Sequence, residues 1–217
     1  MDARQHWERV YRTKRPTEVS WYAPHLDVSL RIIEEAAPER GSRIIDVGGG
    51  EATLVDDLLD LGYRHLSVLD VSATALDVAK ARLGERAGAV DWLCGDVTTF
   101  PFAHHQYDLW HDRAVFHFLT DPKDRAAYIL QVTHAVQPGG HVIVATFGPE
   151  GPTKCSGLEV VRYDPVALHG QFGRNFRLLR HLTEIHQTPS GAAQQFTYCY
   201  CKTSEAPETA GTPEHKV

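Results

Sequence analysis

The chain has 217 residues, of which 42% are hydrophobic and 23% charged, values typical of a globular protein with one sizeable core. Its formal net charge of −6 and the lack of a basic run argue against a nucleic-acid partner. No apolar run is long enough for a membrane span, and the first residues show no apolar signal region. The four cysteines form no Cys-x-x-Cys pair and no disulfide framework, which predicts a protein of the reducing cytoplasm. The lack of a long apolar run predicts that it has no membrane partner.

Two segments precede the predicted core unit. Residues 5–13 carry aromatic and aliphatic side chains at helical spacing, which predicts an amphipathic helix. A loop with two large aromatic residues, Trp21 and Tyr22, follows it. A loop at this place suits a lid over a binding site, although such residues also serve ordinary packing. We therefore expect residues 1–25 to form an N-terminal helix and lid, ahead of a second helix over residues 26–37.

The stretch from Ile44 to Gly50 predicts a buried strand that ends in three successive glycines. Leucines at helical spacing follow it. Strand, glycine turn and helix open a nucleotide-type binding unit, because glycine lets the backbone approach a ligand and the helix start offers unpaired N–H groups. The dinucleotide fingerprint is incomplete, since Thr53 occupies its third glycine position. Asp46 also disfavours a pyrophosphate and suits a ligand with a cationic amino group.

Further acids follow the next two predicted strands. Asp70 ends the second strand, where an acid usually binds ribose hydroxyls. Ser72 is the predicted N-cap of the helix that comes next. A third strand over residues 90–94 ends at Asp96. Since the carboxyl ends of parallel strands share one edge of the sheet, these acids are expected to meet there.

The motifs Asp46-x-Gly48-x-Gly50, Asp70 and Gly95-Asp96-Val97 resemble, in their order and spacing, those of class I S-adenosylmethionine-dependent methyltransferases. The resemblance covers residues 40–150 well and the rest loosely. It implies S-adenosylmethionine as cofactor and S-adenosylhomocysteine as product, with Asp46 at the amino group, Asp70 at the ribose and Asp96 at the adenine. The cofactor-binding residues that it implies are Asp46, Gly48, Gly49, Gly50, Asp70, Val71, Asp96, Val97 and His111. A nicotinamide-type Rossmann domain, or a strand end with chance acids, is the alternative.

A fourth strand over residues 107–112 points its carboxyl end at the same edge, where open α/β sheets bind ligands. His111 and His117 are the candidate catalytic bases, needed only if the acceptor arrives protonated. The other option is that His117 satisfies a backbone group and that Trp21 packs on the first helix. The residues expected to bind the acceptor are Trp21, Tyr22, Asp112, Phe116 and Phe147.

The remaining chain predicts a helix stopped by Pro-Gly-Gly, a strand, a turn-rich loop, a short helix, a hairpin and a disordered tail. In order, these are residues 123–136, 141–147, 148–157, 164–168, 176–201 and 203–217. Residues 26–202 are therefore expected to form one α/β domain of Rossmann-like methyltransferase type. Its sheet is predicted to have seven mostly parallel strands, an antiparallel C-terminal hairpin, and helices on both faces.

The sequence leaves the methyl acceptor open. Methyl transfer from a sulfonium depends mainly on orientation, so no covalent machinery marks the substrate. We expect a nitrogen, sulfur or oxygen nucleophile of a small molecule, since there is no basic patch and residues 111–114 do not clearly match the motif that lysine methyltransferases often carry after strand four. The N-terminal segment does not decide the acceptor, because it resembles the start of thiopurine-type enzymes. It also resembles the citrate-synthase and elongation-factor lysine enzymes, so a protein lysine is the alternative, and a non-catalytic cofactor-binding protein comes third. No metal site is predicted, since the adjacent His104 and His105 cannot share one face.

Overall fold

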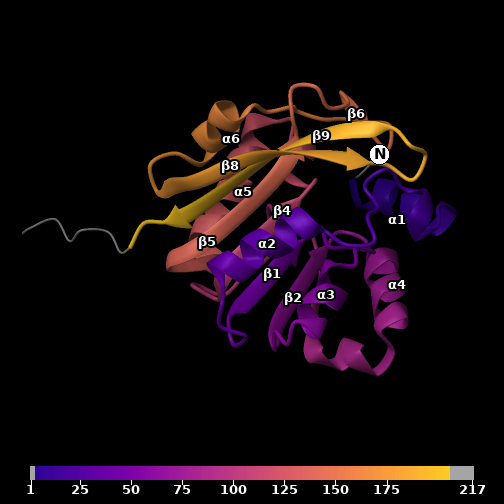
Figure 1. Cartoon of the computed structure of the whole chain (residues 1–217), viewed down its shortest axis with the longest axis horizontal. Coiled ribbons are helices and arrows are strands. Elements are labelled where there is room, and N and C mark those ends of the chain that lie inside the picture. The colour runs from indigo at the N-terminus through magenta and orange to yellow at the C-terminus, as the bar shows by residue number, and fades with distance from the viewer. Residues whose placement is uncertain (1–2, 206–217) are drawn as a thin grey trace, which may run out of the picture.

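The computed structural model describes residues 3–205, and a seven-stranded sheet runs through it (Figure 1). The spatial order of its strands is β3-β2-β1-β4-β5-β9-β8. Strands β1 to β5 pair in parallel, whereas β9 pairs antiparallel with both β5 and β8. This arrangement confirms the predicted Rossmann-like fold class. The strands are β1 (Arg43–Val47), β2 (His65–Asp70), β3 (Val90–Cys94), β4 (Tyr107–Arg113), β5 (Val136–Phe147), β8 (Phe176–Gln187) and β9 (Ala193–Thr203).

Helices cover both faces of the sheet (Figure 1). Side chains of α2, α3 and α4 join one hydrophobic core, and those of α5 and α6 join the other. The strands alternate between the two: Ile44 of β1 belongs to the first core and Ile45 to the second. The helices are α1 (Ala3–Thr13), α2 (Asp27–Ala36), α3 (Leu54–Asp60), α4 (Ala73–Leu83), α5 (Pro122–Ala135) and α6 (Pro165–Phe172). Short 3₁₀ turns are Pro16–Glu18, Gly84–Ala89 and Phe116–Phe118, and a small two-stranded sheet joins β6 (Lys154–Cys155) and β7 (Leu158–Glu159).

Local signals in the sequence place several of these boundaries. The hydroxyl of Ser72 accepts the backbone N–H of Ala75, so Ser72 caps α4 as predicted. Asp164 caps α6 in the same way. Other boundaries differ: α6 extends to Phe172, beyond the predicted residue 168, and β5 begins at Val136, ahead of the Pro-Gly-Gly sequence, where Val136 pairs with Tyr107 of β4. At the other end β9 reaches Thr203, and the predicted tail from residue 206 onward lies outside the described residues.

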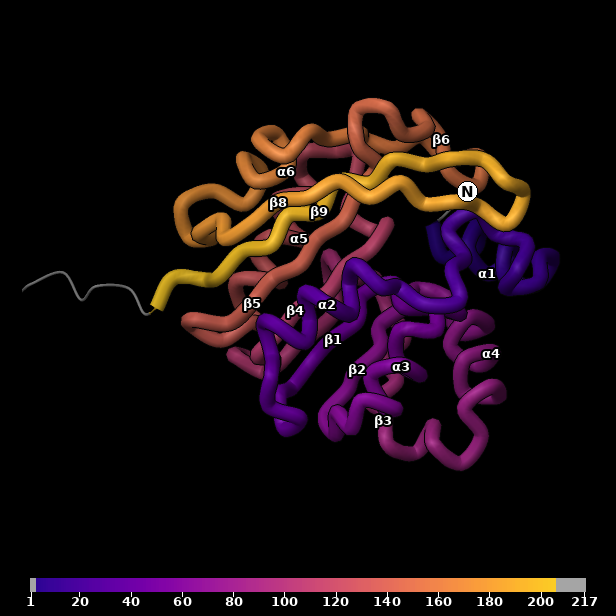
Figure 2. Tube along the Cα trace, viewed as in Figure 1, coloured from indigo at the N-terminus to yellow at the C-terminus, as the bar shows by residue number. Residues whose placement is uncertain are grey.

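The carboxyl ends of the central strands form one edge, and N-terminal and C-terminal segments meet there. Asp46 of β1 is in register with His111 of β4, and Asp70 of β2 with Cys94 of β3. The tube in Figure 2 brings α1, β6 and the turn between β8 and β9 to this end of the molecule. A hydrogen bond of 2.8 Å between His186 Nε2 and the Ser20 carbonyl ties the segment after α1 to β8. Among residues 3–205, no helix has the length and apolar character of a membrane span.

Candidate active site

The glycine turn after β1 requires glycine at two positions. Gly48 and Gly50 have φ angles of +70° and +43°, in the left-handed region that other residues rarely adopt. A Cβ atom on Gly48 would also lie 2.0 Å from Val115 Cγ2, and one on Gly50 would lie 2.8 Å from Asp70 Oδ2. The turn therefore passes close to the loops after β2 and β4, and leaves its backbone open to a ligand on the remaining side.

The larger of two neighbouring cavities measures about 280 Å³ and joins the ends of β1 to β4. Segments distant in the sequence close it: Trp7 and Tyr11 come from α1, and Cys155 and Leu158 from β6 and β7. The predicted cofactor residues in its lining are Gly48, Asp70, Val71, Asp96 and Val97. The structure thus brings together the three motifs on which the sequence prediction depends.

Asp70 is a buried carboxylate in this lining, only 5% exposed. Burial raises the pKa of Asp70 to about 7, opposed by a hydrogen bond from the Ser72 N–H and reinforced by the negative charges of Asp46, Glu8 and Glu51. Ser72 reaches Oδ1 at 2.8 Å. A ligand that donates hydrogen bonds here would relieve part of this desolvation.

Asp96 sits at the far end of the same cavity, after β3. One of its oxygens accepts the Thr98 N–H at 2.8 Å and the Thr98 hydroxyl at 2.7 Å. These two bonds fix the carboxylate against its own loop, while the neighbouring Val97 is buried in the wall. Both residues belong to the cavity lining, and Thr98 bonds only one of the two oxygens of the Asp96 carboxylate.

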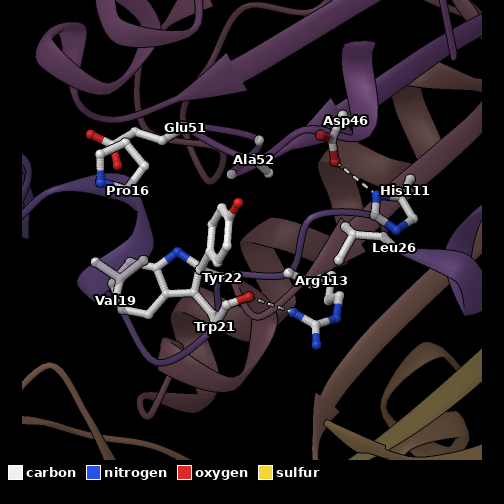
Figure 3. A pocket seen from close by; sticks show the side chains of 13 residues that line it. Pro16, Val19, Trp21, Tyr22, Leu26, Asp46, Glu51, Ala52, His111 and Arg113 are labelled. Atoms are coloured by element: carbon white, nitrogen blue, oxygen red, sulfur yellow. Dashed lines mark hydrogen bonds and ion pairs between the residues drawn. The ribbon is translucent and has the colours of Figure 1, made fainter. Parts of the chain in front are cut away.

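The smaller cavity, about 40 Å³, lies beneath the N-terminal segment (Figure 3). Asp46 lies in its wall and accepts a hydrogen bond from His111 Nδ1 at 2.7 Å. The other ring nitrogen of His111 lies 2.8 Å from the Ser29 hydroxyl of α2, so both nitrogens are engaged and the ring is 1% exposed. The predicted site residues that line this cavity are Trp21, Tyr22, Asp46, Gly48, Gly49 and His111.

Two charged residues that the sequence prediction leaves out also line the smaller cavity. Glu51 is 5% exposed, and its Oε2 has no hydrogen-bond partner among the described residues. Burial raises the pKa of Glu51 to about 7, against the opposing charge of Arg82. Arg113 lies at the other end of the view in Figure 3 and bonds the Trp21 carbonyl. The position of Arg113 at the end of β4 was a usable signal, whereas nothing in the sequence marked Glu51.

The N-terminal segment docks over the site through aromatic and polar contacts. Trp7 packs edge-on against Trp21 and Phe118, with ring centroids 5.7 Å and 5.1 Å apart. Glu8 accepts the Ala73 N–H at 2.8 Å at the start of α4. Trp21 thus packs against α1, as the alternative interpretation expects, and it also lines both cavities.

Four residues predicted to bind the acceptor or to act as a base lie in the packed interior and line neither cavity, which corrects their expected place; Gly50 of the glycine turn, predicted to bind the cofactor, also lines neither. Asp112 is fully buried and accepts the Tyr128 hydroxyl at 2.7 Å and the N–H groups of Val115 and Phe116. The pKa of Asp112 is raised to about 6 by burial. Its carboxylate thus shapes the turn after β4 and leaves no atom for an acceptor. Phe116 and Phe147 are 0% and 1% exposed core residues.

His117 is the fourth of these, and its contacts match the structural alternative. Its Nδ1 accepts the N–H of Phe147 at 3.2 Å, which places the ring proton on Nε2. Burial and then the charge of Arg113 lower the pKa of His117 to about 3. A neutral, enclosed imidazole that satisfies a backbone donor is not positioned to take a proton from an acceptor.

Comparisons with known proteins agree with this geometry. Residues 44–140 match the family model described as a methyltransferase domain. The chain is 30% identical to demethylmenaquinone methyltransferase of Renibacterium salmoninarum, over 65% of each chain. It is 23% identical to the eEF1A lysine and N-terminal methyltransferase of Danio rerio, over 76% of this chain and 24% of that protein. The chain thus spans less than two thirds of the length of these curated relatives.

A solved structure shows the same fold over nearly the whole chain. The N-methyltransferase NodS of Bradyrhizobium japonicum, in complex with S-adenosylhomocysteine, superposes with a TM-score of 0.71 at 15% identity, covering 94% of this chain and 100% of that one. Fold, motif order and family model lead to one conclusion. Together, the methyltransferase-domain match over residues 44–140, the fold and the motif order support a class I S-adenosylmethionine-dependent methyltransferase with S-adenosylmethionine as its cofactor.

Proposed function

We propose that this protein transfers a methyl group from S-adenosylmethionine to a nitrogen, sulfur or oxygen nucleophile of a small molecule. The observation that carries the proposal is the larger cavity, whose lining combines the acids after β2 and β3 with aromatic residues of α1 and of the loop after it. When bound, the cofactor supplies an electrophilic methyl group on a sulfonium. The residues of the chain have to orient it, exclude water and hold the acceptor in line.

The two cavities together suit an extended cofactor. Asp96 and the backbone of Val97 are assigned to the adenine, and Asp70 to the ribose hydroxyls. Gly48 lies where the two cavities meet, and its backbone can approach the sulfur end closely. In the smaller cavity, Asp46 is assigned to the amino group, since His111 bonds its Oδ1 and leaves the second oxygen for a ligand.

The enclosure favours a small acceptor. Trp7, Trp21 and Phe118 form a largely apolar wall that would strip water from the nucleophile and make it more reactive. Cys155 and Leu158 of β6 and β7 add to this lining, which suits a small acceptor. The match to a demethylmenaquinone methyltransferase, named for a small molecule, agrees with this choice.

A protein lysine is the second candidate acceptor. It is favoured by the match to an eEF1A lysine and N-terminal methyltransferase over 76% of this chain. The carboxylates around the site would also attract a cationic side chain. The cavity lining is thus the argument for a small acceptor, and the match to the lysine methyltransferase is the argument for a lysine; labelling of products decides between them.

Isotope transfer tests the proposal. The protein is incubated with methyl-labelled S-adenosylmethionine and either a panel of amines, thiols and phenols or a lysate separated by size. We expect label in a small methylated product that chromatography separates from the unreacted cofactor. Label confined to macromolecules would favour the lysine alternative. In parallel, Asp70→Ala should weaken cofactor binding by about 1–3 kcal/mol in calorimetry, and unchanged affinity would refute the ribose assignment.

A further inference from the structure

Arg113 carries a buried positive charge that the assigned roles leave unexplained. Its side chain is 4% exposed, yet its hydrogen bonds are long: 3.2 Å to the Tyr198 hydroxyl, 3.4 Å to the Trp21 carbonyl and 3.5 Å to Glu184 Oε2. Charge-assisted bonds of a well-paired guanidinium are nearer 2.7–2.9 Å. Because a guanidinium offers five donors, Arg113 retains capacity for a further anion.

Arg113 packs on an aromatic ring and also belongs to the lining of both cavities. The guanidinium lies over the ring of Phe196, 4.0 Å from the centroid. It is the one arginine or lysine among the described residues that line the two cavities, and it lines both, as do Gly48 and Trp21. An anion that reaches the junction of the cavities therefore meets a single, pre-oriented cation.

A negatively charged residue, Asp46, lies in the lining of the same smaller cavity as Arg113. Asp46 and Arg113 both line it (Figure 3), and Gly48 and Gly49 belong to the same lining. An ammonium group beside Asp46 and a carboxylate beside Arg113 together describe an α-amino acid. Asp46 alone would attract any cation. Asp46 and Arg113 together favour a ligand that carries a positive and a negative group.

We infer that Arg113 binds the carboxylate of the amino-acid end of the cofactor, opposite the ammonium group at Asp46. The cofactor is the chosen source of this carboxylate because the shared lining lets one ligand extend from the adenine end past Gly48 into the smaller cavity. This inference rests on the proposed function. An anionic acceptor is the other source of a carboxylate, and the test separates the two.

Calorimetry with two probes isolates the amino-acid end. S-adenosylhomocysteine carries that end, whereas 5′-deoxy-5′-methylthioadenosine lacks it and keeps the adenosine. Arg113→Lys keeps the charge but loses the planar fork, and Arg113→Gln loses both. We expect both variants to bind S-adenosylhomocysteine about tenfold or more weakly, and methylthioadenosine within about twofold of the original protein.

Two further variants distinguish binding from a structural role. Glu184→Gln removes the internal counter-ion of Arg113 while keeping an acceptor for Tyr198, so it should bind S-adenosylhomocysteine more tightly. If Arg113 had only a structural role, Glu184→Gln would not be expected to tighten the binding of S-adenosylhomocysteine. Arg43→Lys, which alters the ion pair with Asp108 at the opposite end of β1, is the matched control and should change neither affinity.

The outcomes are separable. Equal weakening of both probes by Arg113→Lys, or unchanged S-adenosylhomocysteine affinity, overturns the inference. Unchanged probe affinities with a raised KM for an anionic acceptor assign Arg113 to the acceptor instead. If the original protein binds neither probe, the proposed function itself fails.

Discussion

At the scale of single residues, the site contains buried acidic side chains, and their ionisation makes the stability of the folded protein depend on pH. The folded-state pKa of Asp70 is raised from 3.8 to about 7, so between these values the native state binds more protons than the unfolded state. Stability therefore falls as pH rises through this window and levels off above it. Glu51 acts in the same direction. An unligated protein thus carries a penalty at neutral pH that a bound ligand relieves.

Asp70→Asn should therefore raise the stability of the ligand-free protein while lowering its affinity for the cofactor. Without the buried charge, the ligand-free variant should gain on the order of 2–4 kcal/mol in unfolding free energy at pH 8, and little at pH 4. Cofactor affinity should fall at the same time. Denaturant titrations at both pH values measure the first effect, with the exposed Asp77→Asn as control. A variant that is destabilised equally at both pH values would contradict this account.

The two histidines should respond differently to removal. His111→Ala leaves Asp46 and Ser29 without their shared partner, so we expect cofactor affinity to fall by about 1–3 kcal/mol. His117→Ala opens a cavity in the core and should lower stability by about 2–4 kcal/mol, with no new pH dependence of the rate. Binding, unfolding and pH–rate measurements on both variants check this. A pH-dependent rate defect confined to His117→Ala would restore its candidacy as a base.

At the scale of elements, α1 is held to the domain by few polar contacts. Glu8 accepts bonds from the Ala73 N–H and the Thr74 hydroxyl, and these bonds lower the pKa of Glu8. Glu8→Ala should therefore loosen α1 by about 1–2 kcal/mol without unfolding the sheet. Hydrogen exchange of the α1 amides should rise, and the cofactor and acceptor should bind more weakly. Glu18→Ala, which breaks an exposed pair with Arg15, serves as control and should show neither effect.

At the scale of the whole molecule, ligand binding should be visible as added stability. A cofactor at about 100 times its dissociation constant contributes about 2.7 kcal/mol, which for a chain of this size corresponds to a rise in Tm of roughly 5–10 °C. A thermal scan with S-adenosylhomocysteine, and with a nicotinamide cofactor as control, measures it. A larger shift with the nicotinamide cofactor would contradict the family's cofactor in this chain.

The fold was largely predictable because its signals are local. The glycine turn, the cap at Ser72 and the alternation in β8 and β9 each act within a few residues. The cofactor edge followed from topology, since parallel strands place Asp46 and Asp70 at one end. The acceptor side was not predictable in this way. Whether Phe147 faces a pocket or a core depends on contacts with distant segments, and periodicity along one strand does not reveal them.

The same reason explains the misplaced residues near β4. Asp112 and His117 lie next to the expected pocket in the sequence, but a tight turn directs their side chains into the interior, where backbone N–H groups occupy them. Arg113, directly beside Asp112, lines the cavities instead. A difference of one position along the chain thus separates a structural carboxylate from a ligand-facing cation, and only the folded geometry resolves it.

The position of α1 beside the larger cavity also bears on the rate at which the reaction products leave. Residues of α1, β6 and β7 line the larger cavity beside the strand ends, so we expect departure of the demethylated cofactor to be slower than the methyl transfer that precedes it, and to speed up when α1 is loosened. We expect rapid-quench experiments to show a burst of methylated product, nearly equal to the enzyme concentration, followed by a slower steady rate. Glu8→Ala should shorten the residence of the spent cofactor and raise the steady rate relative to the burst. A time course that is linear from the first turnover would place the slow step in the chemistry instead.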